Sequence, residues 1–118
     1  MPRAATSSDV FNAVAEPQRR AILELLASEE RPVGDVGRAL RLAQPSVSKH
    51  LRVLRDVDLV LVRRDGRRML YRTNAPALQP LHEWAGAFER HWQSQLLRIK
   101  ERAESKARPK RGSGSSDE

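Results

Sequence analysis

Hydrophobic residues in the first third of the chain recur every three or four positions, which predicts a series of short amphipathic helices. We expect helices over residues 8–15, 17–27 and 33–40. Ser8 can cap the first helix through its hydroxyl, and Pro17 suits the first turn of the second. The third contains Gly34 and Gly37, and each glycine costs about 1 kcal/mol relative to alanine in a helix interior. Tertiary packing must therefore hold that helix.

The segment QPSVSKHLRVL, residues 44–54, predicts a fourth helix with an unusual polar face. Val47, Leu51 and Leu54 have the spacing of one buried stripe. A solvated helix face is usually rich in both Glu and Lys, but this one has no acid before Asp56. The polar residues that point away from the core are Gln44, Ser46, Ser48, Lys49 and Arg52. We interpret His50, which is adjacent to the buried Leu51, as a structural histidine packed behind this face.

The pattern then changes to that of strands in LVLVRRDGRRMLYRT, where apolar and β-branched residues flank Asp65-Gly66. This dipeptide favours a two-residue hairpin turn. Four arginines gather at its tip, and their mutual repulsion is costly unless an anion relieves it: Arg63, Arg64, Arg67 and Arg68. We therefore expect them to contact phosphate groups.

After Pro76 a long helix is predicted, with an apolar seam that could continue to Ala103. The seam consists of Leu78, Leu81, Ala85, Phe88, Trp92, Leu96 and Ile99. Its aromatic residues lie outside the basic part of the chain, so we interpret them, with Trp84 and Phe11, as core and dimer contacts rather than a platform for stacking bases. Residues 1–7 and 106–118 are expected to be disordered, which leaves one domain over residues 8–105.

The positive charge of the chain is concentrated in the predicted helix over residues 44–54, the hairpin and the residues next to them. The chain of 118 residues has a net charge of +7, and the whole excess lies between Arg31 and Arg72, where eleven basic residues face four acidic ones. Such a concentration is typical of a surface that binds nucleic acid. There is no cysteine, and no apolar run approaches the roughly 18 residues of a membrane span. We expect a cytoplasmic protein without membrane contact.

Two short helices joined by a tight turn, the second one basic, followed by a basic hairpin, predict a winged helix-turn-helix. The second helix would enter the major groove and the hairpin would reach the neighbouring backbone. The predicted fold class is mostly α with a small β-hairpin (α+β), in the order helix, helix, helix, helix, strand, strand, helix. So small a core also makes oligomerisation an expectation.

The stretch LRLAQPSVSKHLRVLRDVDLVLVRRDGRRMLYR resembles the heart of the ArsR/SmtB family of bacterial transcription regulators. The resemblance covers residues from Phe11 to Ile99 and implies a homodimeric repressor whose first and last helices form the interface. It places Gln44, Ser46, Ser48, Lys49 and Arg52 against DNA. The dimer residues would be Phe11, Val14, Leu81, Phe88, Trp92 and Leu96. Ala43 departs from the serine that is common there in the family and cannot cap the helix with its side chain.

The metal sites of the family are not matched by this sequence. Its thiolate site would fall around Pro32 and Gly34, and its second site would need ligands at Pro80 and Leu96. His82 and His91 are nine positions apart, on opposite helix faces at about 100° per residue, so they cannot chelate one ion within one chain. We expect no metal and no cofactor, with a site across a dimer left open. No catalytic motif is present, so no enzyme is expected.

The sequence therefore predicts a sequence-specific regulator of transcription that binds double-stranded DNA, acting as a dimeric repressor of a palindromic operator. The alternative is a protein-interaction module that uses the last helix and has no specific DNA binding. The operator, the target genes, the choice between repression and activation, and any small-molecule or protein effector stay open.

Overall fold

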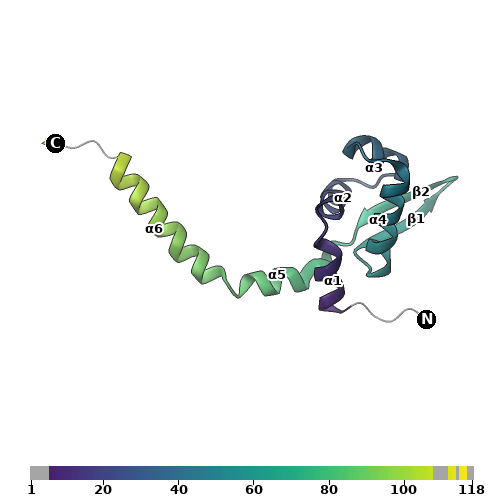
Figure 1. Ribbon diagram of the computed structural model, residues 1–118, viewed down its shortest axis with the longest axis horizontal. Coiled ribbons are helices and arrows are strands. Elements are labelled where there is room, and N and C mark those ends of the chain that lie inside the picture. Colours follow the sequence, from purple (N-terminus) through teal and green to yellow (C-terminus); the bar gives the residue numbers. More distant parts are fainter. Residues whose placement is uncertain (1–5, 108–111, 114, 117–118) are drawn as a thin grey trace. The chain divides into compact units, whose positions relative to one another are not determined.

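The computed structural model describes residues 6–107, 112–113 and 115–116, and its elements follow the predicted order as far as the end of the hairpin (Figure 1). The helices of the first part are α1 (Ser7–Val14), α2 (Pro17–Ser28), α3 (Val33–Leu40) and α4 (Gln44–Asp56). An antiparallel hairpin of β1 (Val60–Asp65) and β2 (Arg68–Thr73) follows, then a 3-10 turn η1 (Ala75–Leu78), α5 (Gln79–Gly86) and α6 (Glu89–Ala107). Two short strands, β3 (Gly112–Ser113) and β4 (Ser115–Ser116), pair with each other. The mostly helical winged helix-turn-helix is thus confirmed.

The chain forms two compact units that meet between Glu83 and Trp84. The predicted boundaries of one domain, residues 8 and 105, stay a prediction. Of the ends expected to be disordered, residues 1–5, 108–111, 114, 117 and 118 lie outside the described residues.

The core of the first unit lies between α1–α4 and the hairpin, and the predicted apolar stripes supply it. Its fully buried side chains include Ile22, Leu26, Val36, Val47, Leu54 and Leu59. The hydroxyl of Thr73 donates a 2.7 Å hydrogen bond to the carbonyl of Leu23, which fastens β2 to α2. The backbones of Arg31 and Tyr71 also exchange two hydrogen bonds, of 3.0 and 2.9 Å, so an isolated antiparallel β-bridge joins the connection from α2 to α3 to the hairpin.

The cap of α1 is Thr6, and the prediction of Ser8 was wrong. The hydroxyl of Thr6 accepts from the backbone N–H of Asp9 at 3.2 Å, and the Asp9 carboxylate accepts from the N–H of Thr6 at 3.0 Å. This reciprocal capping box needs an acid three residues after the cap, which only Thr6 has among the consecutive hydroxyl residues here.

The turn between α3 and α4 is closed by Arg41, whose backbone is left-handed with a φ of 58°. Ala43 then caps α4 without any side-chain hydrogen bond, as its methyl side chain requires.

The hairpin turn is shifted by one residue from its predicted position. Asp65 pairs with Arg68, so Gly66 and Arg67 are the two central residues rather than Asp65 and Gly66. Gly66 has a φ of 65°, and no positive φ is found at Arg67. A positive φ at the first central residue alone is typical of a type II′ turn, which explains a glycine at that place.

The single long helix predicted after Pro76 was wrong, because the structure divides this segment into η1, α5 and α6. Pro80 lacks an N–H and is tolerated only in the first turn, which makes α5 begin at Gln79. Gly86 then ends α5. The N–H groups of Ala87 and Phe88 donate hydrogen bonds to the carbonyl groups three residues earlier, and this tighter turn separates α5 from α6.

Candidate nucleic-acid interface

Four of the five predicted polar residues of α4 are exposed, but the five do not form one cluster. Lys49 and Arg52 lie opposite the buried Val47 and Leu54. Ser48 is exposed on one flank, whereas Ser46 is half-buried and lies about 160° away around the helix, at about 100° per residue. A single element in contact with α4 therefore cannot reach both serines in the same way.

The flank of α4 that carries Ser48 borders the hairpin. Ser48, Arg52 and Arg55 line a hollow of about 180 Å³ with Tyr71 of β2 and Val33 of α3. Arg55 was counted in the basic segment but was not assigned to the site. Its spacing of three from Arg52 and seven from Ser48 would have placed it on their flank.

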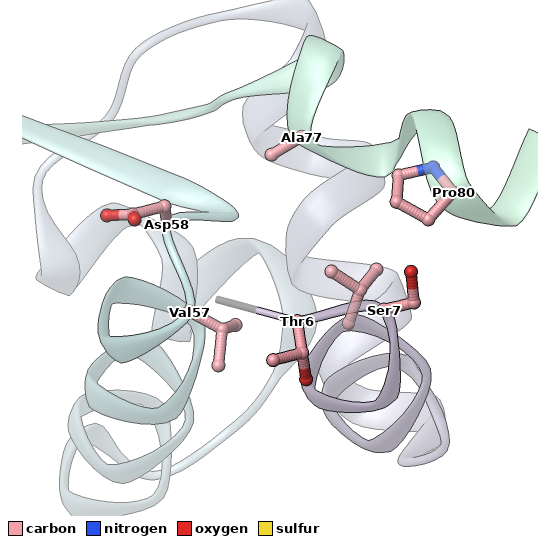
Figure 2. Close-up of a pocket in the computed structure, with 7 residues that line it drawn as sticks. Thr6, Ser7, Val57, Asp58, Ala77 and Pro80 are labelled. Carbon is pink, nitrogen blue, oxygen red and sulfur yellow. The ribbon is translucent and has the colours of Figure 1, made fainter. Parts of the chain in front are cut away.

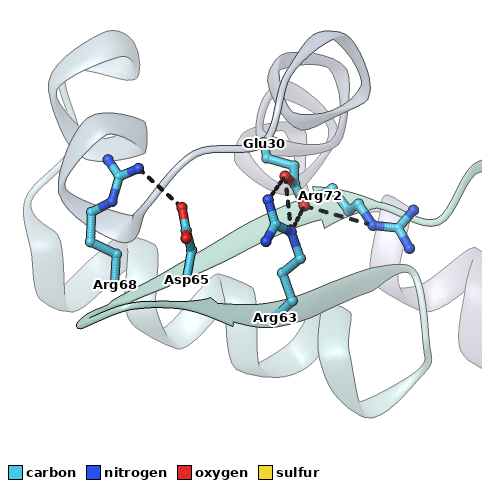
Figure 3. A network of polar contacts seen from close by, with 5 residues as sticks. All are labelled: Glu30, Arg63, Asp65, Arg68 and Arg72. Atoms are coloured by element: carbon cyan, nitrogen blue, oxygen red, sulfur yellow. Dashed lines mark hydrogen bonds and ion pairs between the residues drawn. The ribbon is translucent and has the colours of Figure 1, made fainter.

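One wing arginine is held by an acid from the α2–α3 connection (Figure 3). The carboxylate of Glu30 accepts hydrogen bonds of 2.8 Å from both Nε and Nη2 of Arg63, and Nε of Arg72 lies 3.9 Å away. The hydrogen bond from Arg63 lowers the pKa of Glu30, aided by the positive charges of Arg63 and Arg72 against a smaller desolvation effect. The same bond raises the pKa of Arg63. These contacts link the wing to the connection between α2 and α3.

Strand pairing sorts the other wing arginines by face. Arg68 is paired with Asp65 in the ladder, and Nη2 of Arg68 lies 3.5 Å from Oδ2 of Asp65 on the side that also carries Arg63 (Figure 3). Arg64 alternates to the other face of β1, and Arg67 is in the turn. Within the described part of the chain neither Arg64 nor Arg67 forms an ion pair, so these two present uncompensated charge to an anionic partner.

His50 is a structural residue behind this surface, which confirms its interpretation. It is 9% exposed, and its Nε2 lies 2.9 Å from Oε1 of Gln18 on α2. Its Nδ1 is buried without a hydrogen-bond partner among the described residues. Burial lowers the pKa of His50, and the positive charges of Arg19 and Lys49 act in the same direction. The ring is therefore neutral at physiological pH.

The predicted dimer residues fall in both units. In the first, Val14 and Leu81 line an apolar hollow of about 200 Å³ together with Leu23 and Leu78. Phe11 is half-buried on α1.

In the second unit, the rings of Trp84 and Phe88 pack edge to face with centroids 5.3 Å apart. Trp92 and Leu96 are exposed on α6 by 51% and 62%. Large apolar side chains exposed in this way are typical of a surface that another chain covers.

A separate pocket of about 400 Å³ has no basic side chain in its lining (Figure 2). It is lined by the start of α1, the end of α4 and the η1–α5 segment, with Asp58 as its single ionisable side chain. Across the residues that the structure describes, no group of three or more His, Cys, Asp or Glu is placed to hold a metal ion. No described helix is long and apolar enough to cross a membrane.

Comparison with known proteins identifies relatives of this arrangement. A sequence model described as bacterial regulatory protein, arsR family, matches residues 16–61. The transcriptional repressor SdpR of Bacillus subtilis is 32% identical over 77 residues, which are 65% of this chain and 86% of SdpR. A transcriptional repressor SmtB homolog of Synechocystis is 35% identical over 71 residues, 60% of this chain but only 54% of that protein.

A solved structure has the same fold. The homodimeric winged helix-turn-helix DNA-binding domain of Mb0332 from Mycobacterium bovis superposes with a TM-score of 0.59 at 29% identity, over 71% of this chain and 79% of that one.

Proposed function

The chain belongs to the arsR family of bacterial regulatory proteins, and we propose that it acts as a homodimeric repressor that binds a palindromic operator in double-stranded DNA. The family consists of transcription regulators, which confirms the expectation that the chain is not an enzyme.

The observation that carries the proposal is the uncompensated positive charge on α4 and the wing. Lys49, Arg52, Arg64 and Arg67 are exposed and form no ion pair with described residues. A helix of this width fits the major groove, where its side chains meet base edges while the flanking cations neutralise phosphates. We assign contacts with base edges or phosphate to Gln44, Ser46 and Ser48, whose side chains are the right length for either, and phosphate contacts to Lys49, Arg52 and the wing arginines.

Two wing arginines would have to exchange partners on binding. Arg63 and Arg68 already have carboxylates beside them, so a phosphate competes there with Glu30 and Asp65. Arg64 and Arg67 have no such competitor and would contribute more to affinity.

The homodimer is supported by the exposed apolar residues of α6 and by the homodimeric state of the Mb0332 domain. A two-fold dimer presents two copies of α4 to half-sites about 34–36 Å apart, one turn of the duplex. We propose that α1, α5 and α6 supply the contacts.

The test is a selection of bound duplexes from fragmented genomic DNA, run beside size-exclusion chromatography. We expect a dimer and an enriched inverted repeat whose half-site centres are about 10–10.5 base pairs apart, or a multiple of that spacing. A monomer that ignores duplex DNA at low salt would contradict the proposal and favour the protein-interaction module.

A further inference from the structure

The hollow between α4 and the hairpin has both apolar and polar side chains in its lining. The apolar ones are Val33 and Leu51, which is 2% exposed. The polar ones are those of Ser48, Arg52, Arg55 and Tyr71. All four polar side chains can donate hydrogen bonds, and the lining contains no acidic side chain.

Helix periodicity places the two arginines on the same flank of α4, where both line the hollow. Ser48, Arg52 and Arg55 follow one another at spacings of four and three, so they share one flank of α4. Some of the other arginines have carboxylate partners, such as Arg38 with Asp35 and Arg63 with Glu30. Within the described part of the chain Arg52 and Arg55 have none, so their mutual repulsion is not relieved by an ion pair.

We propose that this hollow binds a phosphate group, with Arg52 and Arg55 supplying the charge and Ser48 and Tyr71 supplying hydroxyl donors. Guanidinium groups bind phosphate through charge-assisted hydrogen bonds, which are about twice as strong as neutral ones. The site adds Arg55 and Tyr71 to the residues assigned from the sequence.

The phosphate can belong to the DNA backbone or to a free phosphorylated compound, and the backbone source rests on the proposed function. A helix in the major groove has a sugar–phosphate backbone along each side, so the wing flank of α4 would face one of them. Because the hollow shares Ser48 and Arg52 with the recognition face, a free phosphate bound there would compete with the duplex.

The first arm of the test measures duplex affinity against salt for Arg55→Gln, Tyr71→Phe and a matched control, Arg98→Gln on α6. Loss of one phosphate contact makes the logarithmic salt slope shallower by about 0.9, which we expect for Arg55→Gln and not for Arg98→Gln. Tyr71→Phe should keep the slope and weaken binding about fivefold, the value of one hydrogen bond of about 1 kcal/mol.

The second arm titrates the protein with inorganic phosphate at constant ionic strength and follows the ring signals of Tyr71, the chain's single tyrosine, by NMR. Saturable shifts that Arg55→Gln abolishes, with an unchanged salt slope, would identify a free phosphate as the ligand. A shallower slope with little response to inorganic phosphate would identify the DNA backbone. An unchanged slope together with no Tyr71 response would overturn the proposal.

The two arms separate this site from the proposed function. If the wild-type chain ignores duplex DNA, the proposed function fails, and the inorganic phosphate titration alone still decides whether the hollow binds phosphate.

Discussion

The carbonyl oxygen of Leu42 lies 2.9 Å from the position that a Cβ atom on Gly37 would occupy. The N–H of Leu42 donates a 2.9 Å hydrogen bond to the carbonyl of Gly37, so the chain folds back tightly against α3 as it enters α4. Gly37 is buried at this contact, and the orientation of α4 depends on it.

Alanine at Gly37 should therefore destabilise the protein by about 1–3 kcal/mol, the usual cost of overpacking a tight site. Gly34 is the matched control, because a Cβ there would meet only the side chain of Arg38 at 3.5 Å. Gly34→Ala should stabilise α3 by about 0.5 kcal/mol through its higher helix propensity. Urea denaturation measures both changes, and equal effects would show that the turn is not tightly packed.

The neutral state of His50 makes stability depend on pH. Because burial lowers its pKa in the folded state, the unfolded chain binds a proton first as the pH falls below 6.5, and stability is lost in that direction. His50→Gln should reduce this slope, since the amide does not titrate. His82→Gln, at an exposed position, should leave it as in the wild type. The measurement is the free energy of unfolding between pH 5 and 8, and an unaltered slope in His50→Gln would be the contrary result.

The ion pair of Glu30 acts in a lower pH range. Its pKa is lowered in the folded state, so its stabilising effect is present above the ordinary value of 4.5 and is lost as the pH falls below it. Glu30→Gln should therefore flatten the acid side of the stability profile between about pH 3 and 5, which lies around that ordinary carboxylate pKa. The control is Glu29→Gln, because the neighbouring Glu29 carboxylate lies 3.5 Å from the guanidinium group of Arg31 and is not paired with a wing arginine. Similar acid profiles for both variants would contradict the role of Glu30.

Two neighbouring leucines on α6 test the dimer contact. Leu96 is in the seam with Trp92, whereas Leu97 lies about 100° further around the helix, and the two are exposed by 62% and 60%. Leu96→Ala should raise the dimer dissociation constant about tenfold or more, since burying a leucine contributes about 1.5–3 kcal/mol, and Leu97→Ala should change it little. Analytical ultracentrifugation gives both constants. A larger effect at Leu97 would place the interface on another face of α6.

The sequence predicts elements better than it predicts the positions where elements end. The apolar stripes of α1–α4 and the alternation in the hairpin identified the fold because burial imposes those periods. The cap at Thr6 depends on two reciprocal hydrogen bonds with Asp9, and the turn at Gly66 and Arg67 depends on the strand register and one φ angle; hydrophobic periodicity reports none of these. The break at Ala87 was missed because the apolar seam continues across it.

The site was predicted with the same limits. Charge located the basic surface, but it could not show that Glu30 engages Arg63 from 33 positions away, or that Ser46 and Ser48 lie on different flanks. Arg55 could have been found from helix spacing alone. Tyr71 could not, because only the tertiary packing of the hairpin brings it into one hollow with residues of α4.

The most direct test of the central claim is to map the DNA contact surface by amide NMR shifts, using an operator duplex and an unrelated duplex. The account predicts that shifts concentrate in residues 44–56 and 63–68 with both duplexes, and that Gln44 and Ser48 respond differently to the two sequences. Shifts confined to α6, with α4 and the wing unchanged, would contradict it.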